Sequence, residues 1–128
     1  MLTSPRFRLV TALALAVMVA SSALAQPPSN VESEVGQLLA RLSASRCTFY
    51  RNGTWYEAAQ AREHLEKKYR YLVKKKLVKT TEDFITLGGT ESSMSHEPYK
   101  VRCGEQVASS RDWLTGQLSQ IRNGETQP

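Results

Sequence analysis

The sequence of 128 residues predicts an α+β domain that is mainly helical, with about four helices and a small two-stranded antiparallel ribbon joined by one disulfide. Three observations predict this class. Apolar residues recur with helical spacing in several segments, the longest of which lacks glycine and proline. Two short segments rich in β-forming residues each carry one of the two cysteines, Cys47 and Cys103. The first residues have the pattern of an export signal, and an oxidising compartment favours pairing of these cysteines.

Residues 1–25 are interpreted as a cleavable signal peptide. Two arginines precede an apolar stretch, and Ala23-Leu24-Ala25 forms an A-x-A cleavage site. An uncleaved membrane anchor is the less favoured alternative, because the apolar stretch is at the short limit for spanning a bilayer. We therefore expect a periplasmic or secreted protein without a transmembrane segment after cleavage. Residues 26–128 would form a single small α+β domain with mobile ends.

The first predicted helix follows a polar leader and depends on one apolar stripe. Ser29 and Glu32 have the spacing of a capping box, and the helix is expected to end near residues 43–45. The stripe has the spacing i, i+4, i+7, i+8 and i+11. Its members are Val31, Val35, Leu38, Leu39 and Leu42.

A strand with a tight turn is expected next. Residues 47–51 are rich in β-forming side chains, and Asn52-Gly53 is a strong hairpin signal. Beyond the turn two alternatives remain open. Residues 54–56 could pair back as a short strand, or Thr54 could cap the following helix through Glu57.

The rest of the chain predicts two more helices, a strand and a last helix. An apolar stripe without glycine or proline predicts a long helix over residues 57–75. Threonine and acidic residues then open a short helix over 82–87, which Gly88-Gly89 ends. Residues 98–103 alternate as an edge strand with proline at its start. The last helix opens at Ser109 or Ser110 and directs its apolar side chains inward.

Cys47 and Cys103 are predicted to form a structural disulfide. If the two cysteine-bearing strands pair antiparallel, their sulfur atoms come close together. Closing this loop would restrict the unfolded chain by about 4 kcal/mol. The sequence has no C-x-x-C pair that would indicate redox activity.

Several short motifs follow one another along the chain in the order and with the spacing found in a known protein family. They are Phe49-Tyr50-Arg51-Asn52-Gly53, then Ala61 with His64-Leu65 and Lys68-Tyr69, then Thr81-Glu82-Asp83-Phe84-Ile85, then Ser92-Ser93 with Pro98-Tyr99-Lys100-Val101. The chain resembles the YfeK-like family of small exported bacterial proteins, a domain of unknown function. The resemblance implies a signal peptide and a small periplasmic domain, and it implies no activity, cofactor or catalytic residue. That family does not require the cysteine pair and often has glycine in place of His96, so a family-wide catalytic role for His96 is not expected.

The sequence gives little support to a metal, a cofactor or nucleic acid. The net charge of +5 falls to about +3 without the signal peptide, which is too weak to favour nucleic acid. His64 is followed four residues later by Lys68, where a zinc protease helix would need a second histidine. We therefore predict no metal site, no cofactor and no catalytic residue. His64 lies off the apolar stripe and is interpreted as a hydrogen-bonded or partly exposed side chain.

Two surfaces are candidates for binding. The segment 67–79 has seven basic residues and no acidic one, so it could contact anionic lipid, cell-wall carboxylates or an acidic protein, although a solvated helix face is the simpler interpretation. Aromatic residues around the Asn52-Gly53 turn could form a small recognition patch, although partly buried packing is again the simpler interpretation. The candidate binding residues are Arg51, Trp55, Tyr56, Lys67, Arg70, Lys74 and Lys75.

The favoured hypothesis is a non-catalytic binding or accessory protein of the bacterial cell envelope, with an acidic protein or an anionic envelope component as its partner. The alternative is a small hydrolase that uses the loop from Ser92 to His96, with His64 contributing. This loop contains serine, histidine and glutamate, the residue types of a nucleophilic site. However, residues so close in sequence seldom form a triad, and the loop has no G-x-S-x-G motif.

Overall fold

The structure is a computed structural model that describes residues 2, 3, 5, 12–18 and 29–125. The cleavage site predicted at residues 23–25 lies outside the described residues, as does most of the predicted signal peptide. Among the residues described, no helix has both the length and the apolar character needed to cross a membrane.

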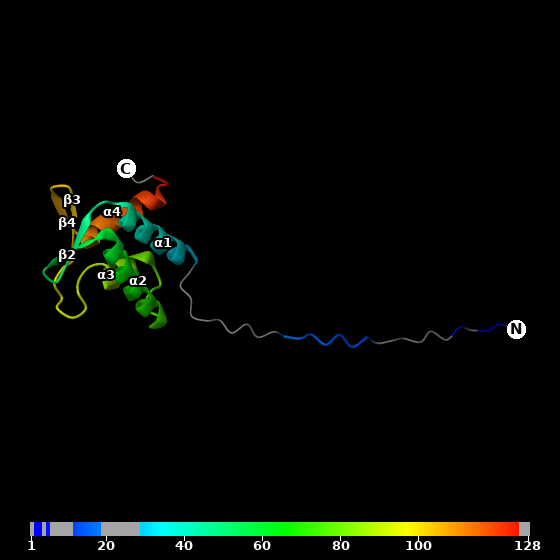
Figure 1. Ribbon diagram of the computed structural model, residues 1–128. Coiled ribbons are helices and arrows are strands. Elements are labelled where there is room, and N and C mark those ends of the chain that lie inside the picture. Colours follow the sequence, from blue (N-terminus) through cyan, green and yellow to red (C-terminus); the bar gives the residue numbers. More distant parts are fainter. Residues whose placement is uncertain (1, 4, 6–11, 19–28, 126–128) are drawn as a thin grey trace.

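The described chain folds into four helices and four strands, which confirms the predicted α+β class (Figure 1). Each predicted helix is present, with ends within a few residues of those expected. The elements follow in the order α1 (Ser29–Ala44), β1 (Thr48–Arg51), β2 (Thr54–Glu57), α2 (Ala58–Lys74), α3 (Thr81–Gly88), β3 (Lys100–Cys103), β4 (Gln106–Ser109) and α4 (Ser110–Arg122).

The sheet is larger than the predicted ribbon. It has four antiparallel strands in the order β2-β1-β3-β4, so the two predicted strands form its central pair. Thr54 begins β2, which confirms the hairpin alternative and excludes Thr54 as a helix cap. Asn52 and Gly53 have φ values of 48° and 89°, the two positive values that a type I′ hairpin turn requires.

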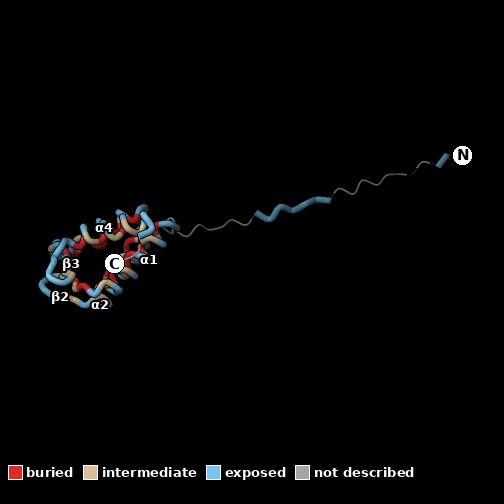
Figure 2. Tube along the Cα trace, turned by 90° about the horizontal axis from the view of Figure 1, so that it is seen from above, coloured by how far each residue is buried: buried red, intermediate tan, exposed pale blue. Residues whose placement is uncertain are grey.

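The core lies between the helices and one face of the sheet, so that buried residues face inward (Figure 2). Helices α2 and α4 pack against the strands, and α1 contacts the other three helices. All five residues of the predicted α1 stripe are buried, because each falls on the face that α1 turns toward the other helices. In the sheet Phe49 pairs with Val101, and both side chains enter this core.

Two helix ends explain where the chain changes direction. At the start of α3 the Thr80 hydroxyl accepts a hydrogen bond from the Asp83 amide, and the Asp83 carboxylate accepts one from the Thr80 amide. At the end of α2 the Leu77 amide bonds to the Leu72 carbonyl and the Lys76 amide to the Val73 carbonyl, the Schellman pattern. Lys76 takes the left-handed conformation of this pattern, with φ of 59°.

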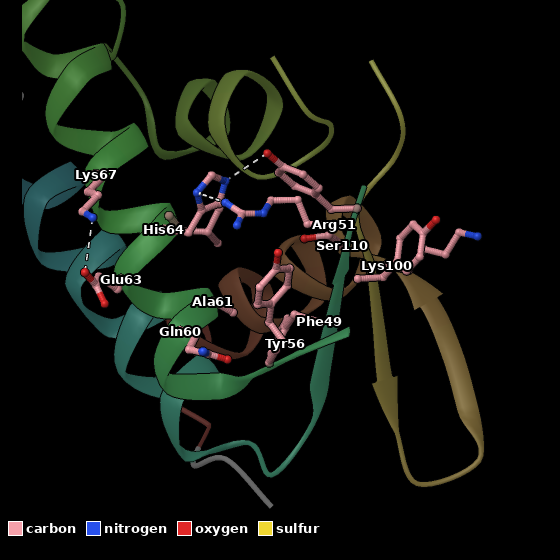
Figure 3. A pocket seen from close by; sticks show the side chains of 13 residues that line it. Phe49, Arg51, Tyr56, Gln60, Ala61, Glu63, His64, Lys67, Lys100 and Ser110 are labelled. Carbon is pink, nitrogen blue, oxygen red and sulfur yellow. Dashed lines mark hydrogen bonds and ion pairs between the residues drawn. The ribbon is translucent and has the colours of Figure 1, made fainter. Parts of the chain in front are cut away.

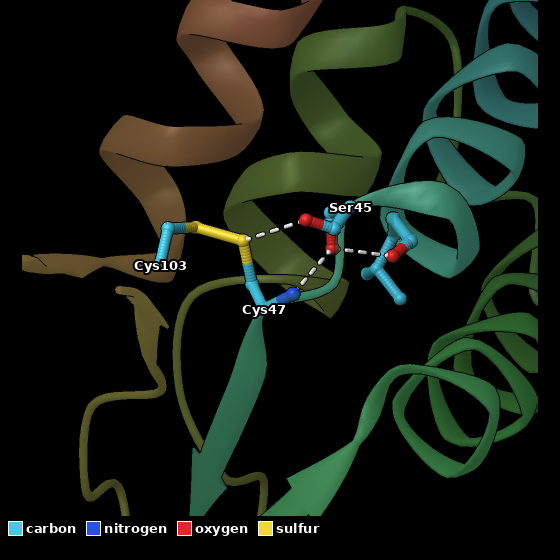
Figure 4. Close-up of a disulfide and its surroundings, with 4 residues drawn as sticks. Ser45, Cys47 and Cys103 are labelled. Atoms are coloured by element: carbon cyan, nitrogen blue, oxygen red, sulfur yellow. Dashed lines mark hydrogen bonds between the residues drawn. A yellow bond between two sulfur atoms is a disulfide. The ribbon is translucent and has the colours of Figure 1, made fainter. Parts of the chain in front are cut away.

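The predicted disulfide between Cys47 and Cys103 is present (Figure 4). Thr48 pairs with Arg102, so the next residue outward on each strand is a cysteine, and their Cα atoms lie 4.5 Å apart. Ser45 connects this bond to α1, because its hydroxyl donates to the Leu42 carbonyl and accepts from the Cys47 amide. The disulfide thus joins the two central strands at the end where the chain leaves α1.

Candidate functional site

A pocket of about 260 Å³ lies between the β1-β2 hairpin and α2, and we call it the basic pocket (Figure 3). The hairpin supplies its sheet side, and one face of α2 supplies the opposite wall. Its lining residues are Phe49, Tyr50, Arg51, Tyr56, Gln60, Ala61, Glu63, His64, Leu65, Lys67, Tyr99, Lys100 and Ser110.

Arg51 is directed into the pocket because it ends β1 on the face that meets the helices. Its guanidinium lies 4.7 Å from the centre of the Tyr56 ring and donates a hydrogen bond, with Nη1 2.5 Å from Nδ1 of His64. Since arginine only donates, Nδ1 of His64 must be the acceptor. The proton of the neutral imidazole is therefore on Nε2.

His64 in turn connects the hairpin to the segment before β3. Its Nε2 lies 3.1 Å from the hydroxyl oxygen of Tyr99, and the Lys68 ammonium donates to the same oxygen at 3.2 Å. Lys68 also donates to the carbonyl of Glu91 at 3.0 Å. Because the Tyr99 oxygen accepts from both neighbours, its own O–H is left to donate to another group.

Burial and neighbouring charges keep these groups in defined protonation states. Burial, followed by the charges of Arg51 and Lys68, lowers the pKa of His64 to about 4, so the ring is neutral at neutral pH. Burial lowers the pKa of Lys68, while the Glu91 carboxylate acts in the opposite direction. Burial also raises the pKa of the Tyr99 hydroxyl, which therefore stays protonated.

The half-buried cations of this site have neutral hydrogen-bond partners. Among residues 29–125, neither Arg51 nor Lys68 forms an ion pair with a carboxylate. Glu63 lies at the edge of the pocket, but it pairs with Lys67 at 3.2 Å and both side chains are largely exposed. The site therefore presents hydrogen-bond donors and positive charge, and its two half-buried cations are hydrogen-bonded to neutral groups.

The structure divides the predicted binding residues among several places. Arg51, Tyr56 and Lys67 all line the basic pocket. Trp55 lies on the opposite face of the sheet, where the Arg102 guanidinium is 3.8 Å from its ring centre. The aromatic residues around the turn thus do not form one patch.

The remaining basic candidates lie along α2 and just beyond its end. Arg70 pairs with Glu66 at 2.7 Å, and the Lys75 ammonium lies 5.7 Å from the centre of the Tyr71 ring. Lys74 is exposed in the last turn of the helix. These three residues do not line the basic pocket, so the basic run does not act as one unit in it.

The loop proposed for the hydrolase alternative is fastened to the hairpin. Ser92 is buried, and its hydroxyl accepts hydrogen bonds from the Asn52 side chain and from the amides of Met94 and Ser95. His96 instead meets the Glu91 carboxylate at 3.1 Å, with 74% of its side chain exposed. In the described part of the chain no hydrogen bond joins either histidine ring to a serine, and no cluster of three or more His, Cys, Asp or Glu could hold a metal.

Sequence reasoning missed two members of the site, Lys68 and Tyr99. The interpretation of His64 as a hydrogen-bonded, partly exposed side chain is confirmed. One local signal was available, since His64 and Lys68 are four residues apart and share a helix face. Nothing local pointed to Tyr99, because its hydroxyl reaches α2 only after β3 pairs with β1.

Comparison with known proteins places most of this fold in one family. Residues 29–122, which include every helix and strand found in the described part of the chain, match a family described as "Family of unknown function (DUF5329)". The comparisons with curated proteins and with solved structures give no match.

Proposed function

Since the chain belongs to the DUF5329 family of unknown function, we propose its function from the basic pocket: it is a non-catalytic binding or accessory protein that holds the carboxylate or phosphate group of an anionic component of the cell envelope. The observation that carries this proposal is a connected set of donors: Arg51 and Tyr99 line the basic pocket, and Lys68, which lies outside its lining, donates to the Tyr99 hydroxyl. Within residues 29–125 neither cation is paired with a carboxylate.

The physical basis is the cost of taking charge out of water. A half-buried cation loses part of its hydration, and a neutral partner restores only some of what is lost. A bound anion would supply the missing charge and would accept hydrogen bonds from guanidinium, ammonium and hydroxyl donors. His64 favours this arrangement because its neutral ring accepts a hydrogen bond from Arg51 and holds the guanidinium in place without adding a charge.

The proposed location rests on other features. The Cys47–Cys103 disulfide is typical of proteins in oxidising compartments. Together with the signal peptide predicted for residues 1–25, it supports a periplasmic or secreted protein. The relation to YfeK-like proteins stays a prediction and agrees with the same location.

Titration of the purified protein with methyl phosphate and with acetate, followed by NMR, tests the proposal. We expect shifts at the backbone amides of Arg51 and Tyr99 and at the His64 ring. Replacing Arg51 by Met should weaken binding at least about tenfold, because a charge-assisted hydrogen bond contributes about 1.5–3 kcal/mol.

The matched control is Lys74→Met, which removes one charge from an exposed position of α2 outside the pocket. It should leave the affinity unchanged. A second variant, Lys68→Met, should weaken binding as Arg51→Met does. The proposal would be contradicted if Lys74→Met lost as much affinity as Arg51→Met. It would also be contradicted if neither anion changed the NMR signals of the pocket residues.

A further inference from the structure

A second recess adjoins the basic pocket and has a different chemical character. It has a volume of about 240 Å³, and Tyr71, Leu72 and Leu87 form its apolar wall. Two of these side chains are unusually exposed for their size, with 59% of Tyr71 and 46% of Leu87 accessible to solvent. We call this recess the apolar groove.

The two recesses lie next to each other along one face of α2. His64 and Lys67 line both of them. Glu63 lies toward the basic pocket and Tyr71 toward the apolar groove, so successive turns of one helix face, each about 5.4 Å apart, lead from one to the other. A single extended ligand could therefore occupy both.

The groove also has two basic residues in its lining, Lys67 and Lys68, and both connect it to the basic pocket. Lys68 lines the groove and donates to the Tyr99 hydroxyl, which lines the basic pocket. An anion held by Arg51 and Tyr99 would therefore lie next to an apolar wall. Exposed apolar side chains bordered by basic ones are complementary to a molecule with an acidic end and an apolar remainder.

We infer that the ligand of this protein is an anionic amphiphile. Its carboxylate or phosphate binds in the basic pocket, and an apolar chain lies along Tyr71, Leu72 and Leu87 in the apolar groove. This inference rests on the proposed function, because it assigns the anion to the same pocket. It adds that affinity depends on the length of the apolar chain.

Paired ligands measure this dependence. Methyl phosphate and decyl phosphate share a head group, and decyl maltoside supplies the same chain without a charge; each is titrated below its critical micelle concentration. We expect decyl phosphate to bind at least about tenfold more tightly than methyl phosphate, because each buried methylene contributes about 0.8 kcal/mol. Decyl maltoside should bind more weakly than decyl phosphate.

Two variants test where the apolar chain of the ligand lies. Leu87→Gln should remove most of the advantage of decyl phosphate and leave methyl phosphate binding unchanged. The matched control is Val107→Gln, which alters another exposed apolar residue, on β4 and outside both recesses. It should change neither the binding of methyl phosphate nor the advantage of decyl phosphate.

The outcomes separate this inference from the proposed function. If methyl phosphate binds in a manner that depends on Arg51 and the decyl chain adds nothing, the amphiphile inference alone is wrong. If neither the two phosphates nor the matching carboxylates, acetate and decanoate, bind, both are wrong. Binding to vesicles that contain anionic lipid, without preference for decyl over methyl phosphate in solution, would also overturn the inference, because the target would then be a charged surface.

Discussion

Arg51 on β1 donates a hydrogen bond to Nδ1 of His64 on α2, with the two nitrogen atoms 2.5 Å apart. This contact requires an unprotonated nitrogen, because a protonated ring would oppose two positive groups at hydrogen-bond distance. The pair therefore couples the hairpin to α2 and makes the contact between them sensitive to pH.

The protein should become less stable as the pH is lowered, because of His64. Its pKa is lowered from 6.5 to about 4 in the folded state, so below pH 6.5 the unfolded chain takes up a proton that the folded chain rejects. The contribution of His64 to the free energy of unfolding should thus decrease as the pH falls from 6.5 to 4, and should be constant above and below this window. The total decrease should be at most about 3 kcal/mol.

Urea unfolding at several pH values measures this decrease, and His64→Gln provides the comparison. Glutamine offers an acceptor to Arg51 but does not titrate. The variant should lose less stability than the natural protein across the same window, while the carboxylates that titrate there affect both proteins alike. Parallel pH profiles for the two proteins would show that His64 does not carry the effect.

The disulfide should provide a large part of the stability. Cys47 and Cys103 are separated by 56 residues. Closing a loop of this length restricts the unfolded chain by about 4 kcal/mol, so replacing both cysteines by alanine should lower the free energy of unfolding by about 2–5 kcal/mol. Denaturant unfolding of the natural protein with and without reductant should show the same difference, and the variant should not respond to reductant.

Replacing two of the glycines by alanine should change the stability of the protein in opposite directions. A Cβ atom at Gly89 would meet Leu114 Cδ1 at 2.5 Å, and Leu114 is buried, so Gly89→Ala should destabilise the protein by about 1–3 kcal/mol. A Cβ atom at Gly36, within α1, would meet nothing within 4 Å. Gly36→Ala should therefore stabilise the protein by about 0.5–1 kcal/mol, as measured by thermal or urea unfolding. The same sign for both variants would contradict the packing described at Gly89.

Glycine at position 76 should give a more stable protein than alanine at the same position. It has φ of 59° directly after the end of α2, in a position that usually favours glycine. Lys76→Gly and Lys76→Ala remove the same charge, so their difference reports the backbone. We expect the glycine variant to be more stable than the alanine variant by about 1 kcal/mol. Equal stabilities in urea would mean that the left-handed conformation adds no cost.

The fold was predictable where one element carries its own signal. The stripe of α1 and the Asn52-Gly53 turn are local patterns, and both are confirmed. Strand β4 was missed because all four of its residues are exposed, so no alternation of apolar and polar side chains marks Gln106–Ser109 as a strand. Only its pairing with β3 makes it a strand.

The candidate site was predictable only in part, because it depends on contacts between distant elements. Arg51, Tyr56 and Lys67 were selected by residue type, and they line one pocket. Trp55 was selected by the same criterion but lies on the other face, since adjacent residues of a strand point in opposite directions. That alternation would have separated Trp55 from Tyr56 once the hairpin alternative was adopted.

The position of the disulfide has a kinetic consequence for the basic pocket. Every lining residue except Ser110 lies between Cys47 and Cys103 in the sequence. If the hairpin and α2 separate transiently, the ends of this segment stay tied together, and its residues search a smaller volume before they meet again. The disulfide therefore shortens the time for which the hairpin and α2 stay separated. In a chain with reduced cysteines the pocket would re-form more slowly.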